Sequence, residues 1–147
     1  MADIMSDTRD ATIERKNVAA RAAWAAGDMA GAETLLLEAW AELDAAELEG
    51  DAAKTDWHQK LSSSLVTLYQ RTQQFDEARR WLETMRRLYE KDGAPDPHIL
   101  FVRATLDYDS SDFDAAFDGF ATLYAKFGKR PFAGKDVKYL QFYESRR

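Results

Sequence analysis

The sequence predicts an all-α protein of one domain, with about seven helices arranged as antiparallel pairs. Apolar residues recur at intervals of three and four almost throughout its 147 residues, and no stretch sustains the alternation typical of strands. Only seven glycines and three prolines interrupt the chain, and none of the prolines precedes Pro95. Hydrophobic residues make up 46%, which is enough to form a core. Long helices joined by short turns are therefore the expected architecture.

Three turn signals divide the first half of the chain. Gly27-Asp28 separates the first two helices, Gly50-Asp51 ends the second, and Gln73-Gln74 precedes the fourth. Residues 1–16 alternate in charge and contain no apolar run, and we expect residues 1–8 to be disordered. The helices between these turns carry apolar stripes at helical spacing, which indicate one buried face each. The stripe residues are Met29, Ala32, Leu35, Leu36, Ala39, Trp40 and Leu43 in the second helix, and Leu61, Leu65, Leu68 and Tyr69 in the third.

Three further turns divide the second half. The fourth helix carries the stripe Trp81, Leu82, Met85, Leu88 and Tyr89 and ends at the segment 92–97. There we expect Asp96 to cap the fifth helix, with Pro97 at its first helical position. The segment 110–112 turns into the sixth helix, and the segment 128–134 leads to the last.

The last helix, at about 135–146, is expected to cap the fold. Its aromatic residues Tyr139, Phe142 and Tyr143 stand at positions i, i+3 and i+4, so they share one face. A stack of helical repeats needs such a helix to cover its terminal apolar face. We expect Phe132 to pack under this cap.

Three of the turns share a pattern: a polar turn, a large apolar residue, and an alanine three positions later. They are Gly27-Asp28-Met29-Ala30-Gly31-Ala32, Gln73-Gln74-Phe75-Asp76-Glu77-Ala78 and Ser111-Asp112-Phe113-Asp114-Ala115-Ala116, offset by 46 and 38 residues. The pattern resembles the tetratricopeptide repeat, a helix–turn–helix unit of about 34 residues. The resemblance implies a short superhelix of three stacked, degenerate repeats plus the capping helix. The repeats would span about 11–49, 54–92 and 96–128.

The middle repeat matches the family most fully. Its matching positions are Leu65, Tyr69, Phe75, Ala78 and Leu82. In the first repeat Ala23 replaces the tyrosine of the family, and none of the three repeats carries the closing proline at the expected position.

Charge and composition narrow the function classes. The formal net charge is −6, which argues against non-specific nucleic-acid binding over the whole surface, and no cofactor is expected. Residues 126–147 hold seven basic side chains against two acidic ones, so RNA binding through this segment stays a minority alternative. The absence of cysteine excludes disulfides and thiolate zinc sites, and two histidines leave little for a metal site. No apolar run could serve as a secretory signal or membrane span, so we expect a cytoplasmic protein without membrane partners.

No catalytic constellation stands out. The segment 128–136 is similar to a phosphate-binding loop only superficially, because five residues separate its glycines and Asp136 replaces the magnesium-binding Ser or Thr. We interpret it as a basic turn. The acidic run Asp107, Asp109, Asp112, Asp114 and Asp118 lacks the glycine and the spacing of a calcium loop and is expected to be a solvated face. An enzyme using helix-borne carboxylates such as Asp109 and Asp112 remains an alternative.

The resemblance instead implies a non-catalytic module for protein–protein interaction. In tetratricopeptide proteins the first helix of each pair lines a concave groove that binds a peptide or protein. The corresponding residues here combine cations, hydrogen-bonding side chains and aromatics, as expected of a binding surface. The groove candidates are Asn17, Arg21, Trp24, Lys60, Ser63, Thr67, Gln70, Arg71, His98, Phe101, Thr105 and Tyr108. The family's clamp for a C-terminal carboxylate is not reproduced.

Within this groove we expect Trp24 and Tyr108 to flank Arg71 as binding hot spots. The alternative makes Tyr108 a packing residue.

A second candidate surface is the acidic segment 28–51, which holds eight carboxylates and no basic residue. With the small size and the net charge of −6, it favours an alternative function: a small bacterial regulator or immunity-type protein that masks one basic partner. The segment could instead pair with the arginines of the fourth helix, within the chain or between chains, which leaves a homodimer open. These arginines are Arg79, Arg80, Arg86 and Arg87.

Overall fold

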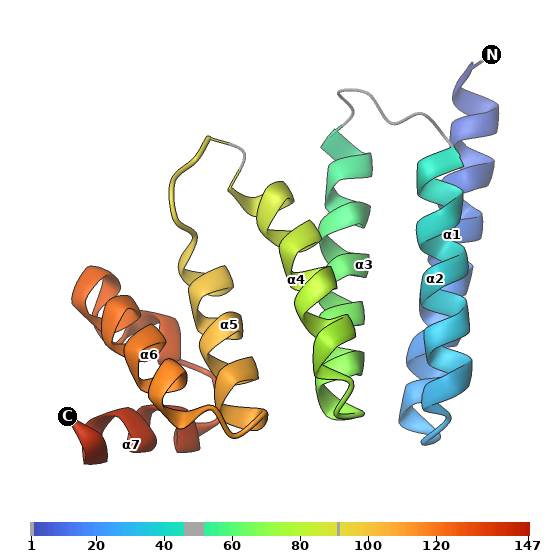
Figure 1. The fold of residues 1–147 in the computed structure, drawn as a ribbon. Coiled ribbons are helices and arrows are strands. Elements are labelled where there is room, and N and C mark those ends of the chain that lie inside the picture. Colours follow the sequence, from blue (N-terminus) through green and yellow to red (C-terminus); the bar gives the residue numbers. More distant parts are fainter. Residues whose placement is uncertain (1, 46–51, 91) are drawn as a thin grey trace. The chain divides into compact units, whose positions relative to one another are not determined.

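The chain is helical in the part that the structure, a computed structural model, describes: residues 2–45, 52–90 and 92–147 (Figure 1). These residues form seven α-helices and one 3-10 turn, and no strand, so the all-α prediction is confirmed. The helices are α1 (Ala2–Ala25), α2 (Met29–Ala45), α3 (Ala52–Arg71), α4 (Phe75–Tyr89), α5 (Pro97–Asp109), α6 (Phe113–Phe127), the 3-10 turn η1 (Arg130–Phe132) and α7 (Val137–Arg146). Residues 2–8, expected to be disordered, belong to α1. The expected helix end at Gly50-Asp51 lies outside the described residues.

Backbone contacts group the chain into two compact units, Met1–Thr72 (unit 1) and Gln73–Arg147 (unit 2). The boundary falls at the polar turn Gln73-Gln74, inside the second expected repeat. The prediction of a single domain over 1–147 stays a prediction.

Unit 1 consists of a helical hairpin and a third helix against it. α1 and α2 run antiparallel, and α3 packs on α2 (Figure 1). The hairpin buries residues at intervals of three and four, and its alanines allow close approach of the two backbones. The buried residues are Ile13, Asn17 and Ala20 on α1 and Ala32, Leu36, Ala39 and Leu43 on α2, each at most 7% exposed. Across the pair, Lys16 Nζ lies 2.8 Å from Glu38 Oε2.

Unit 2 is built around an aromatic cluster. α4 packs on α5, α5 pairs with α6, and η1 and α7 cover this pair. The ring centroid of the fully buried Phe120 lies 5.6 Å from that of Phe132 and 5.8 Å from that of Tyr139. The prediction that the last helix caps the fold, with Phe132 packed under it, is confirmed.

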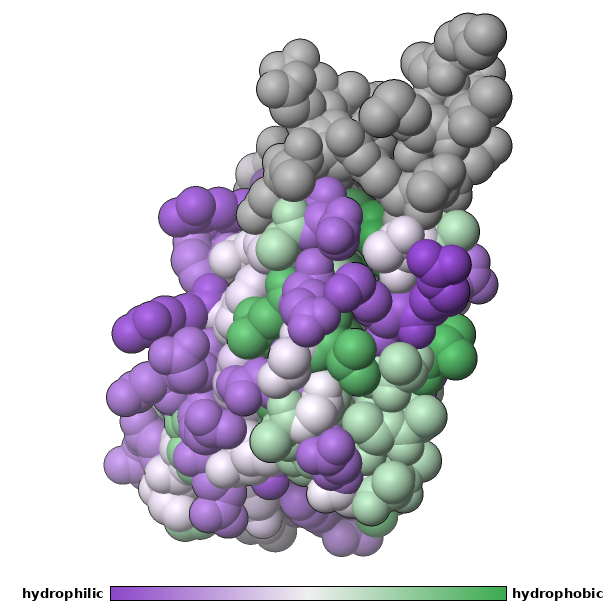
Figure 2. Space-filling model, turned by 90° about the vertical axis from the view of Figure 1, so that its right-hand side faces the viewer, coloured by the Kyte–Doolittle hydropathy of each residue, from purple (hydrophilic) through white to green (hydrophobic). Residues whose placement is uncertain are grey.

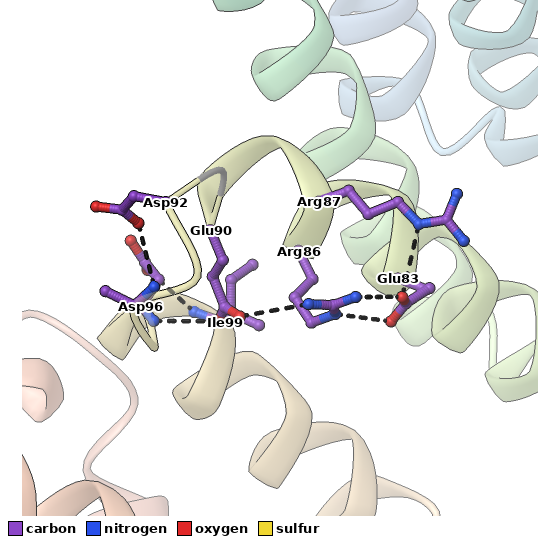
Figure 3. Close-up of polar contacts among 8 residues, drawn as sticks. Glu83, Arg86, Arg87, Glu90, Asp92, Asp96 and Ile99 are labelled. Atoms are coloured by element: carbon purple, nitrogen blue, oxygen red, sulfur yellow. Dashed lines mark hydrogen bonds and ion pairs between the residues drawn. The ribbon is translucent and has the colours of Figure 1, made fainter.

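The end of α4 is held by a group of charged side chains (Figure 3). Arg86 donates to both carboxylate oxygens of Glu83, from Nε at 3.0 Å and from Nη2 at 2.6 Å. Its remaining guanidinium nitrogen, Nη1, lies 3.5 Å from Glu90 Oε1. The hydrogen bond from Arg86 is the main cause that lowers the pKa of the Glu83 carboxyl.

Glu90 connects this group to the start of α5 (Figure 3). Its carboxylate accepts from the backbone N–H of Asp96 at 3.1 Å. Asp96 in turn accepts from the backbone N–H groups of His98 and Ile99, at 2.8 and 3.3 Å. Asp96 is therefore the N-cap of α5, with Pro97 in its first turn, as the sequence predicts.

The turn after α1 combines a helix end with a helix start. Gly27 adopts a left-handed conformation with φ 82°. Asp28 N donates to Ala23 O at 2.8 Å and Gly27 N donates to Trp24 O at 2.9 Å, the two bonds of a Schellman motif. The Asp28 carboxylate then accepts from Gly31 N at 2.9 Å, which caps α2.

The turn after α5 repeats this arrangement. Ser111 is left-handed with φ 69°, although it carries a side chain. Asp112 N donates to Asp107 O at 2.8 Å and Ser111 N donates to Tyr108 O at 3.0 Å. The Asp112 carboxylate caps α6 by accepting from Ala115 N at 3.3 Å. The aligned positions of the first and third predicted repeats therefore have the same local structure.

The middle turn shares the left-handed residue. Gln73 has φ 61°, and Gln74 precedes α4 as its N-cap without a side-chain cap bond. All three aligned turns thus place a left-handed residue directly before the N-cap.

The left-handed turns predict stability changes of opposite sign. Gly27→Ala should lower the free energy of unfolding by about 1 kcal/mol, because a side chain disfavours φ > 0. A Cβ at this position would meet no atom within 4 Å, so only the backbone contributes. Ser111→Gly should raise it by about 0.5 kcal/mol, since glycine adopts this conformation freely. Urea unfolding followed by circular dichroism measures both changes, and equal signs would contradict the turn assignment.

Candidate binding surface

The C-terminal ends of α1 and α3 bring together Trp24 and Arg71, two of the predicted groove residues. The guanidinium carbon of Arg71 lies 5.6 Å from the centroid of the Trp24 ring, within the range of a cation–π interaction. Arg71 is exposed and Trp24 is half-buried. In the described part of the chain, no carboxylate lies within ion-pair distance of Arg71. The indole therefore holds the guanidinium at the surface without an ion pair.

Arg71 also has a structural role. It is the last residue of α3, and a cation in the last helical turn interacts favourably with the helix dipole. The interaction with the helix dipole uses the charge of Arg71 and does not occupy its N–H donors. These donors therefore stay available to a partner.

The other groove candidates of unit 1 differ in exposure. Arg21, Lys60 and Thr67 are exposed, whereas Ser63 and Gln70 are half-buried. Asn17 is 7% exposed and lies among the buried residues of α1, so it presents little surface to a partner. Lys60 lies over the Trp57 ring at 5.0 Å. It precedes Arg71 by about 16 Å along α3, at 1.5 Å per residue, so the structure does not bring these two cations together.

The α5 candidates face the aromatic core of unit 2. Phe101 is 6% exposed, and its ring centroid lies 5.7 Å from those of Phe132 and Tyr139. Thr105 is 4% exposed and donates its hydroxyl hydrogen bond to Val102 O at 2.7 Å. Neither side chain is available to a partner in this conformation.

Tyr108 is packed by the capping helix. Its ring centroid lies 5.4 Å from that of Tyr139 and 5.0 Å from that of Phe142, both on α7, and 5.3 Å from that of Phe113. These contacts fit the packing interpretation of Tyr108. The three aromatic side chains of α7 indicate a large apolar face, and the sequence alone does not show that this face covers residues of α5.

His98, the remaining α5 candidate, is half-buried in the first turn of the helix. Its ring centroid lies 5.9 Å from that of Tyr89. Burial, and to a smaller extent the charge of Lys135, lowers the pKa of the His98 imidazole, while Asp96 opposes the shift. The neutral form of His98 is therefore favoured at neutral pH.

The acidic run on α5 and α6 has structural contacts. Tyr139 donates its hydroxyl hydrogen bond to Asp109 Oδ1 at 3.0 Å, and burial, followed by the charge of Asp109, raises the pKa of this hydroxyl. Arg79 Nη1 lies 2.9 Å from Asp107 Oδ1, and Arg146 pairs with Asp114. Asp107, Asp109 and Asp114 therefore connect neighbouring helices through their side chains, and Asp112 caps α6.

The arginines of α4 pair within unit 2. Besides the Arg79 and Arg86 pairs, Arg80 Nη1 lies 3.3 Å from Glu77 and Arg87 Nε lies 3.7 Å from Glu83. In the acidic segment of unit 1, Glu38 pairs with Lys16. The side chains of Asp44, Glu47, Glu49 and Asp51 lie outside the described residues.

The outer face of α1 and α2 mixes apolar and polar side chains (Figure 2). Val18 is 56% exposed and Leu37 is 38% exposed. On α1, Val18 and three alanines line a shallow depression together with Glu14 and Arg15. We assign no partner to this face.

Two further features of the described residues bear on function. None of their helices combines the length and the apolar character needed to cross a bilayer. Their histidine, aspartate and glutamate side chains form no group of three that could hold a metal ion.

A scan against protein-family models and searches of curated proteins and of solved structures found no match for this chain. The tetratricopeptide resemblance therefore rests on the repeat pattern and on the helical hairpins described above.

The two predicted hot-spot types should separate in stability measurements. Tyr108→Ala should lower the free energy of unfolding by about 2–3 kcal/mol, because it removes a ring packed against three others. Arg71→Ala should change it by less than about 1 kcal/mol, since the side chain is exposed. Urea unfolding of both variants gives the comparison. Unchanged stability of Tyr108→Ala would instead favour a role for Tyr108 in binding.

Proposed function

We propose that this chain is a tetratricopeptide-like protein–protein interaction module that binds an acidic segment of a partner protein through Trp24 and Arg71. The observation that carries the proposal is the exposed guanidinium of Arg71, whose central carbon lies 5.6 Å from the ring centroid of the half-buried Trp24. Tryptophan and arginine are the side chains most enriched among the residues that dominate binding energy at protein interfaces.

The recurring turn supports the assignment to this class of fold. Left-handed residues stand directly before the N-cap at Gly27, Gln73 and Ser111, the three positions aligned by sequence. Two of the three turns also share both hydrogen bonds of a Schellman motif and an aspartate cap. Such recurrence is typical of a chain built from repeated helix–turn–helix units.

The chemistry of the surface favours a carboxylate-bearing partner. A guanidinium that lies over an aromatic ring keeps the N–H donors at its own edge free, and a carboxylate can accept two of them. Arg21 lies one turn before Trp24 on α1 and is exposed, which adds a second positive charge at this end of the helix. Thr67, one turn before Arg71 on α3, is exposed, but its hydroxyl already donates to Ser63 O at 3.0 Å, so we assign it no contact with the partner.

Selection from a displayed library of random peptides tests the proposal. We expect enrichment of peptides that contain Asp or Glu, with affinities then measured by fluorescence anisotropy on the full chain. Arg71→Gln should weaken binding of the selected peptides about tenfold, which corresponds to about 1.4 kcal/mol.

Arg80→Gln provides the matched control, because Arg80 is also an exposed arginine, with 77% of its side chain accessible. It should leave the affinity unchanged. The proposal is contradicted if no acidic peptide is enriched, or if Arg71→Gln and Arg80→Gln have equal effects.

A further inference from the structure

A surface pocket of about 480 Å³ opens in unit 2 beside the segment that links α6 to α7. Pro97, Phe127, Pro131 and Ala133 supply its apolar walls. Three nitrogen-bearing side chains, His98, Arg130 and Lys135, complete the lining. The volume falls within the range of small-molecule sites, which combine apolar walls with a few polar groups.

The charge of this lining is positive. No aspartate or glutamate lines the pocket. Among the described residues, Arg130 and Lys135 have no carboxylate within ion-pair distance. The two carboxylates adjacent to the lining in sequence are engaged as helix caps: Asp96 accepts from His98 N at 2.8 Å and Asp136 accepts from Lys138 N at 3.0 Å. The pocket therefore offers two uncompensated cations.

Lys135 is placed by the aromatic core. Its Nζ lies 5.6 Å from the centroid of the buried Phe101 ring, at the distance of a cation–π contact. This contact holds the ammonium group close to the Phe101 ring. Burial, and to a smaller extent the charge of Lys135, lowers the pKa of the His98 imidazole, so the neutral ring is favoured on this side of the pocket. A neutral ring adds a hydrogen-bonding group without a further charge.

The backbone of the linking segment excludes a phosphate cradle. In phosphate-binding loops, free backbone N–H groups point at the anion. Here Phe132 N donates to Lys129 O at 2.9 Å, and both Ala133 N and Lys135 N donate at 3.1 Å, to Arg130 O and Phe132 O. These three donors are used within the segment, so none of them is available to a bound anion.

We propose that this pocket binds a small monoanionic carboxylate with an apolar aryl or alkyl body. Arg130 and Lys135 contact the carboxylate, and the apolar body packs against Phe127 and the two prolines. Two cations and an apolar enclosure suit a single negative charge on an apolar group better than a strongly hydrated, multiply charged anion. The site uses neither Trp24 nor Arg71, and it shares only His98 with the groove candidates predicted from the sequence.

Titration of the full chain with 3-phenylpropionate and with hexanoate tests the proposal. Binding is measured from amide chemical shifts and by calorimetry. Both should bind in about the millimolar range and shift the amide signals of Ala133 and Lys135. The uncharged 3-phenylpropionamide and inorganic phosphate should each bind at least about tenfold more weakly, because each lacks one half of the recognised chemistry.

Variants locate the contacts. Arg130→Gln and Lys135→Gln should each weaken 3-phenylpropionate binding about fivefold, and Phe127→Ala about threefold. Lys129→Gln is the matched control, since Lys129 is an exposed cation next to Arg130 that does not line the pocket. Circular dichroism verifies that each variant is folded.

Three results would overturn the proposal. The first is the absence of amide shifts around Ala133 with both carboxylates. The second is phosphate binding as tight as that of 3-phenylpropionate, which would indicate a simple cationic patch. The third is an equal loss of affinity in Lys129→Gln and Lys135→Gln, which would indicate long-range attraction without a specific site.

Discussion

A left-handed residue followed directly by a capping residue determines how the helices pair. After α1 and again after α5, the aspartate whose backbone N–H donates a closing hydrogen bond to the preceding helix also caps the next helix with its side chain. Two consecutive helices are then only a few residues apart and must lie side by side. Small residues on the facing surfaces permit this: a Cβ on Gly119 of α6 would stand 3.0 Å from the Cβ of Ala104 on α5. The apolar stripes of each pair meet as a consequence.

The aromatic capping helix packs against side chains of α5 that were predicted to bind a partner. In a stack of repeats, the first helix of a pair would present Phe101, Thr105 and Tyr108 to a partner. η1 and α7 supply Phe132, Tyr139 and Phe142, whose rings contact those of Phe101 and Tyr108, and Thr105 is 4% exposed. Rings packed edge to face gain more from this burial than from exposure to a partner. The candidate binding surface that remains is the pair Trp24 and Arg71 in unit 1, and unit 2 has the positively charged pocket beside η1.

Local patterns predicted the helices, their caps and most buried stripes. The expected positions Leu61, Leu65 and Leu68 are all at most 1% exposed, because period and burial are both encoded within one helix. Asp96 and Asp112 cap helices as expected, since capping depends on the next few residues only. The burial of Phe101 and the pocket at Lys135 could not be predicted, because both arise from segments that meet only through tertiary packing. The Trp24–Arg71 contact was expected as part of a groove, and the structure confirms the contact itself.

We propose that a partner's carboxylate binds to the guanidinium of Arg71, which lies against the Trp24 ring. The indole N–H signal of Trp24 in a two-dimensional NMR spectrum reports on this surface most directly, with Trp24→Phe used to assign it. During titration with a selected acidic peptide, we expect the Trp24 signal to shift and to saturate at the same midpoint as binding. The signal of Trp81 in unit 2 should stay in place. Saturated binding with an unmoved Trp24 signal would contradict the proposal.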